Sequence, residues 1–156
     1  PIDQFQWTDL STSGVTDMGK ALKMVAEELK MPPMSDRALP PVLVLISDGQ
    51  PTDNFEEGLQ SIMALPWGKK AVRVAIGIGH DADTDVLEAF IGNKEIPVLQ
   101  ANNPEQLVKY IKWVSTVVLK ATSSPASQVN TGLNITNNVA IPTPPTPDPA
   151  SPLDVW

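Results

Sequence analysis

The stretch Val42-Leu43-Val44-Leu45-Ile46-Ser47-Asp48-Gly49-Gln50-Pro51-Thr52-Asp53 decides the fold class of this chain. Its first five residues are β-branched or Leu, which is typical of a strand buried on both faces of a parallel sheet. An acidic turn with a Gly follows at once, so Asp48 is predicted to stand at the carboxyl end of the strand. Open α/β sheets bind ligands at this end, although Asp-Gly is also a common turn dipeptide. Asp48 is therefore a candidate binding residue, with turn formation as its alternative role.

A second polar loop, Ser13-Gly14-Val15-Thr16-Asp17-Met18-Gly19, runs directly into a helical pattern. Thr16 or Asp17 is predicted to cap this helix, because Thr and Asp side chains accept hydrogen bonds from the first amides of a helix. The capped end should lie at the rim of the same sheet as Asp48. We therefore expect the two loops to face each other.

Apolar spacing and turn signals divide the chain into alternating helices and strands. Helices are predicted over residues 17–30, 54–65 and 83–91 and from residue 103 onward, and strands over 42–46, 71–78 and 96–99. The last helix is expected to cover one face of the sheet with a stripe of Leu107, Ile111, Val114 and Val118, flanked by Tyr110, Trp113 and Val117. This alternation predicts an α/β fold, a partial doubly wound, Rossmann-like parallel sheet with helices on both faces.

Three motifs together resemble the von Willebrand factor type A (VWA) domain. The first is Gly-x-Thr-x-x-Gly-x-Ala-Leu from Gly14 to Leu22, and the second is Ser-Asp-Gly-x-Pro-Thr-Asp from Ser47 to Asp53. The third is the core strand with a Gly-x-Gly ending, from Val72 to Gly79. Their order and spacing agree with the family over residues 10 to about 120, and most closely with its bacterial tellurium-resistance type.

The resemblance implies a metal-ion-dependent adhesion site for Mg²⁺ or Mn²⁺. Thr16 would supply a hydroxyl ligand, and Asp48 a carboxylate that binds the ion directly or through water. The loops that support the site would depend on four further residues: Gly14, Asp17, Gly49 and Asp53. Of these, Gly49 would allow the turn after the strand, because glycine adopts backbone conformations that other residues avoid. Mg²⁺ takes about six oxygen ligands, and a site rich in neutral hydroxyls leaves its charge underneutralised. An acidic side chain of a partner protein would then complete it.

The family's site begins with an Asp-x-Ser-x-Ser loop that follows a central strand. No apolar strand precedes Ser11-Thr12-Ser13, which we interpret as an ordinary loop. The chain opens at Pro1 with sequence typical of the middle of a domain, so we interpret it as amino-terminally truncated, without the first strand and its loop. The metal site is then expected to be incomplete, Mg²⁺ binding weak or absent, and the outer edge of strand 42–46 open.

Composition excludes several classes of function. Among 156 residues, 18 acidic side chains outnumber 11 basic ones without a dense basic patch, which argues against nucleic-acid binding. The absence of Cys excludes disulfides and thiolate metal sites. No apolar run approaches the roughly 18 residues of a membrane span, and no signal pattern opens the chain. We therefore predict a cytoplasmic protein that contacts neither nucleic acid nor membrane.

The chain is predicted to divide into a partial VWA domain over residues 1–122 and a flexible tail over 123–156. The tail is rich in Ser, Pro, Thr and Asn and has no Lys or Arg. Its stretch from Ile141 to Pro149 should favour the polyproline II conformation. The alternative is that the tail is a docking peptide for a partner.

Other motifs are weaker. The Gly77-Ile78-Gly79 turn lacks the third Gly of a dinucleotide loop, because Ala82 stands at that position. His80 is the only histidine, which is too few for a zinc site. Asp81, Asp83 and Asp85 alternate like calcium ligands, but the required Gly and distal Glu are out of register.

The sequence favours a non-enzymatic, metal-dependent protein-binding module. By resemblance it would be a scaffold in a bacterial stress or metal-resistance system, with a protein kinase and a phosphatase as possible partners. One alternative is a metal-independent interaction domain with the Pro-rich tail as its docking peptide. The least favoured alternative is a hydrolase that uses Asp48, because no base and nucleophile converge with it in the sequence.

Overall fold

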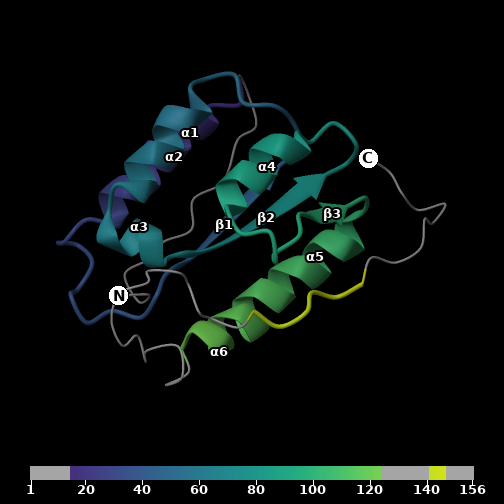
Figure 1. Cartoon of the computed structure of the whole chain (residues 1–156). Coiled ribbons are helices and arrows are strands. Elements are labelled where there is room, and N and C mark those ends of the chain that lie inside the picture. The colour runs from purple at the N-terminus through teal and green to yellow at the C-terminus, as the bar shows by residue number, and fades with distance from the viewer. Residues whose placement is uncertain (1–14, 124–140, 147–156) are drawn as a thin grey trace.

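Three parallel strands form the sheet of this protein, whose computed structural model describes residues 15–123 and 141–146. The strands are β1 (Val42–Ser47), β2 (Val72–Ile78) and β3 (Leu99–Ala101), and they lie side by side in that order (Figure 1). All three run in the same direction, with β2 paired to both neighbours. The partial, parallel α/β architecture predicted from the sequence is thus confirmed.

Helices cover both faces of this sheet. One face carries α1 (Met18–Glu28), α2 (Phe55–Met63), the short α3 (Pro66–Lys70) and α4 (Thr84–Ile91). The other face carries α5 (Pro104–Trp113), a π-helical turn (Val114–Val118) and α6 (Leu119–Thr122), as Figure 1 shows. Within residues 15–123 and 141–146, no helix has both the length and the apolar character needed to cross a bilayer.

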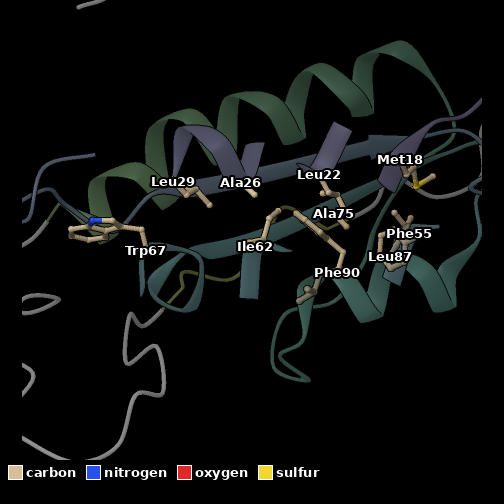
Figure 2. Close-up of a cluster of buried hydrophobic side chains, with 11 residues drawn as sticks. Met18, Leu22, Ala26, Leu29, Phe55, Ile62, Trp67, Ala75, Leu87 and Phe90 are labelled. Atoms are coloured by element: carbon tan, nitrogen blue, oxygen red, sulfur yellow. The ribbon is translucent and has the colours of Figure 1, made fainter. Parts of the chain in front are cut away.

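The first core cluster fills the space between the sheet and α1, α2 and α4. Figure 2 shows Leu22, Ile62 and Phe90 gathered around Ala75 of β2. Ile62 and Ala75 are fully buried. These helices are amphipathic, and burial of their apolar stripes is the main force that holds them on the sheet.

The second core cluster lies between the sheet and α5. Val72, Val74 and Ile76 face it because alternate side chains of a strand point to opposite faces. Tyr110 and Trp113 are the aromatic residues that α5 contributes, and both are buried.

The stripe predicted for the last helix is therefore wrong in one respect. Ile111, expected inside, is 43% exposed, and Leu107 is only half-buried. The helix has turned so that the large surfaces of Tyr110 and Trp113 face the sheet, since aromatic side chains have the most apolar area to bury. Val114 and Val118 are buried as predicted.

Two predicted boundaries also differ. The third strand begins at Leu99 rather than Ile96, because its partner on β2 is the segment from Ile76 to Ile78, near the end of that strand. Pro97 has no amide hydrogen to donate to a ladder. The helix predicted over residues 54–65 ends at Met63, and the short α3 begins at Pro66. Proline is favoured at the first position of a helix.

The outer edge of β1 has no strand beside it among the described residues, where β1 pairs with β2 alone. Val44 and Ile46 point to the α5 side of the sheet and are 39% and 42% exposed. This part of the structure agrees with the expectation of an open, apolar edge.

Candidate functional site

The carboxylate of Asp53 joins the two candidate loops. Its two oxygens accept hydrogen bonds from the amides of Gly19 and Lys20, at 2.8 and 2.7 Å. These amides belong to the first turn of α1, where backbone N–H groups lack partners within the helix. The side chain of Asp53 therefore caps a helix from a loop more than thirty residues away in sequence.

The hydrogen bond from Gly19 is the main reason why the pKa of Asp53 lies below its usual value. Desolvation is the second-largest effect and opposes it by raising the pKa, while the bond from Lys20 and the charge of Lys23 lower the pKa further. The cap is thus made by the ionised form of Asp53. An anion at a helix N-terminus is also favoured by the helix dipole.

A backbone hydrogen bond completes the junction of the loops. The amide of Thr52 donates to the carbonyl oxygen of Thr16 at 3.0 Å. Thr16 lies just before α1, and Thr52 lies in the turn that follows β1. The prediction that the two loops face each other is confirmed.

The helices behind the loops approach closely at two glycines. A methyl group at Gly19 would lie 2.2 Å from the carbonyl oxygen of Asn54, and one at Gly58 would lie 2.5 Å from that of Gly19. Only glycine leaves room for these contacts. Gly19 is the second Gly of the first motif, so its presence there has a packing reason.

Asp17 occupies the N-cap position of α1, but its side chain makes no capping hydrogen bond. The sequence-based expectation that Thr16 or Asp17 caps the helix is therefore wrong for Asp17. Asp53 supplies the acceptor instead. A local pattern cannot reveal this exchange, because the capping residue comes from another loop.

Gly49 has a different role from the one expected. Its φ lies outside the left-handed region, and an added Cβ would meet no atom within 4 Å. The turn does not require glycine at this position, so the expected conformational reason is wrong. The turn is held instead by the buried Ser47, whose hydroxyl donates to the Gly49 carbonyl at 3.1 Å and accepts from its amide at 3.3 Å.

The predicted metal ligands lie on the joined loops. Thr16 is half-buried and Asp48 is exposed, while Gly14 lies outside the described residues. Within the described ranges, no group of three or more His, Asp or Glu side chains is placed to hold a metal ion. Since Mg²⁺ takes about six oxygen ligands, Thr16 and Asp48 do not fit such an ion by themselves.

The interpretation that the Asp-x-Ser-x-Ser loop is absent needs a correction. The spacing does occur in the sequence, at Asp9, Ser11 and Ser13, immediately before Gly14. No run of apolar residues precedes it, since the chain from Pro1 to Thr8 is mixed in character. These residues lie outside the part that the structure describes. They are therefore further candidate oxygen ligands for the metal ion, without a described position.

Two amide side chains that no motif in the sequence predicted hold the loops after the neighbouring strands β2 and β3. Gln100 of β3 donates from Nε2 to the carbonyl oxygen of Gly79, which has a φ of 69°. The side chain of Gln106 accepts from the amide of Asn102 at 2.9 Å. A signal for Gln106 exists, because Gln three residues after the N-cap Asn103 is typical of a capping box.

The weaker candidates do not form a site. Asp83 accepts hydrogen bonds from the amides of Asp85 and Val86, so it caps α4 as a helix-start residue. His80 and Asp81 are exposed. Of the three alternating acids, Asp83 is thus a helix cap.

Comparison with known proteins gives one match. The family model of the von Willebrand factor type A domain matches residues 2–113, which include both joined loops and all three strands. No curated protein and no solved structure matches the chain. The chain therefore belongs to the von Willebrand factor type A domain family.

Proposed function

We propose that this chain is a protein-interaction module that binds an acidic side chain of a partner with the loops around Thr16 and Asp48. The observation that carries the proposal is the junction made by Asp53, which fixes the first turn of α1 against the turn after β1. A binding surface made of two loops needs such a rigid support, because ligand groups must be held in place before the partner arrives. Membership of the VWA family supports an interaction role.

We further propose that a divalent cation, Mg²⁺ or Mn²⁺, takes part in this contact. Hard cations prefer carboxylate and hydroxyl oxygens, which Asp48 and Thr16 offer. The remaining donors would have to come from water, from the partner's acid, or from residues outside the described part. Asp9, Ser11 and Ser13 are the candidates in the sequence.

Calorimetric titration of the chain with Mg²⁺ and with Mn²⁺ tests this proposal. We expect weak binding that Asp48→Asn removes, because the substitution keeps the shape of the side chain and deletes its charge. Asp36→Asn is the matched control, since Asp36 is an exposed acid in the segment between α1 and β1. Equal binding by the wild type and Asp48→Asn would contradict a role for Asp48. No binding by the wild type would favour the metal-independent alternative.

Further proposals rest on the sequence. The chain would be a cytoplasmic, non-enzymatic protein of the bacterial tellurium-resistance type, a scaffold in a stress or metal-resistance system that works with a kinase and a phosphatase. A phosphoester substrate such as p-nitrophenyl phosphate tests the non-enzymatic assignment. Metal-dependent turnover that is lost in Asp48→Asn would establish the hydrolase alternative instead.

A further inference from the structure

The described piece of the Pro-rich tail packs on the domain. Residues 141–146, Ile-Pro-Thr-Pro-Pro-Thr, run alongside α5 in Figure 1, where they are drawn in yellow. Ile141 is half-buried and packs against the second core cluster, as do Val42 of β1 and Leu107 of α5. The segment thus contacts the face of the sheet opposite to α1 and α2.

Burial in this segment repeats every three residues. Ile141, Pro142, Pro144 and Pro145 are half-buried, whereas Thr143 and Thr146 are exposed. A polyproline II helix has three residues per turn, so this pattern gives one face toward the domain and one toward solvent. The segment has neither helical nor strand hydrogen bonding. Its pattern is that of a polyproline II ligand seated on a surface.

The second core cluster, against which Ile141 packs, contains the kind of side chain on which such ligands dock. Proline-rich peptides dock on aromatic side chains, and their solvated backbone carbonyls are free to accept hydrogen bonds. Tyr110 and Trp113 belong to the same cluster as Ile141. The indole N–H of Trp113 is buried, and no hydrogen-bond acceptor for it lies among the described residues. A buried donor without an acceptor is costly, so the signal of this N–H should respond to a change in the packing of the cluster.

Exposed apolar side chains extend the surface beyond the segment. Val44 and Ile46 lie on the same face of β1 as Val42 and are 39% and 42% exposed. On α5, Ile111 is 43% exposed. A proline-rich ligand without charged residues suits such a surface, and residues 141–146 carry none.

We propose that the α5 face is a binding surface for proline-rich peptides and that residues 141–146 occupy it as a displaceable ligand in cis. A tethered ligand acts at an effective concentration on the order of millimolar. A contact that is weak in trans is therefore enough to keep the surface occupied in cis. A partner with a tighter proline-rich segment displaces the tail, and this second interaction is independent of the loops around Asp48.

Heteronuclear NMR of the full chain with a synthetic peptide tests the proposal. The probe is an acetylated peptide with the sequence of residues 139–148, and the signal is the Trp113 indole N–H, assigned with Trp113→Phe. The full-length Ile141→Ser variant should release the tail and bind the added peptide at least about tenfold more tightly than the wild type, because intramolecular competition is reduced. Thr143→Ser is the matched control, since Thr143 is exposed, and it should behave like the wild type.

A second variant protects the test against an indirect effect of Ile141→Ser. Replacing Pro144 and Pro145 by Gly lowers the preference for polyproline II and should increase peptide binding in the same way. A peptide that carries both glycines should not bind. No shift of the Trp113 signal in any folded variant at about 5 mM peptide, a high concentration against the effective one, would overturn the binding surface. Equal peptide affinity in the wild type and both variants would overturn occupation in cis.

Discussion

Gly19 and Gly49 give a matched test of the loop junction, because the same substitution should destabilise the protein at the first position and leave its stability almost unchanged at the second. In Gly19→Ala the new Cβ would lie 2.2 Å from the carbonyl oxygen of Asn54, against about 3.4 Å for an ordinary contact. That oxygen is backbone, so α1 and the turn before α2 must separate. In Gly49→Ala the new Cβ meets nothing within 4 Å, and φ is not in the left-handed region.

The expected magnitudes follow from these contacts. Overpacking in a tight region costs about 1–3 kcal/mol, and replacing Gly by Ala in a helix returns up to about 1 kcal/mol. We therefore expect Gly19→Ala to lower the free energy of unfolding by about 1–2 kcal/mol. A substitution away from any special feature stays within about 0.5 kcal/mol, and we expect this of Gly49→Ala.

Urea denaturation followed by circular dichroism measures both variants. The midpoint should fall in Gly19→Ala with little change in the slope, since the exposed surface on unfolding is the same. Gly58→Ala should resemble Gly19→Ala, because it fills the same contact from α2, 2.5 Å from the Gly19 carbonyl oxygen. Equal stability of Gly19→Ala and Gly49→Ala would refute the reasoning that α1 and the Asp53 loop are in direct backbone contact.

Three further predictions concern single interactions. Asp53→Asn should destabilise the protein at pH 7, and the difference from the wild type should shrink as the pH falls through the lowered pKa of Asp53. The reason is that a carboxylate whose pKa is depressed by folding stabilises the folded state only while it is ionised. Urea midpoints measured across acid pH check this, and a constant difference would contradict it. Asn103→Ala should lower the free energy of unfolding by about 1 kcal/mol, because it removes the acceptor for the Gln106 amide at the start of α5; an unchanged thermal midpoint would argue against this cap. Arg73→Met should lower the free energy of unfolding by about 1–2 kcal/mol, since the guanidinium donates from Nε to the Phe90 carbonyl oxygen at 2.6 Å near the end of α4. A urea midpoint equal to that of the wild type would show that this bond is not needed.

Much of the fold could be predicted from local pattern. The apolar run from Val42 and the one at Val72 are long enough to identify buried strands, and both lie where expected. The third strand has only three residues, and its predicted position was wrong because its register depends on the partner strand. The centre of the α5 stripe was wrong for a similar reason, since Tyr110 and Trp113, predicted as its flanks, are buried in place of Ile111. Periodicity predicts a stripe, and competition between large and small side chains sets its centre.

The candidate site divides in the same way. The residues Thr16, Asp48 and Asp53 were found from motifs, because turn and capping chemistry uses few residue types. Their arrangement relative to one another could not be predicted from the sequence, since Asp53 caps a helix that begins far away in sequence. The prediction that the turn requires glycine at position 49 was wrong, because the presence of a Gly in the sequence does not reveal its φ angle.

By itself, the sequence determined the fold class, the family and the two loops, because alternating apolar segments and short turn motifs act over neighbouring residues. Only the tertiary structure decided that Asp53 joins these loops and that Gly19 admits the contact. Only the structure placed residues 141–146 against the α5 face. The physical reason is that hydrogen bonds and packing between segments distant in sequence depend on where the folded sheet places these segments. A local sequence pattern does not encode the distance between them in space.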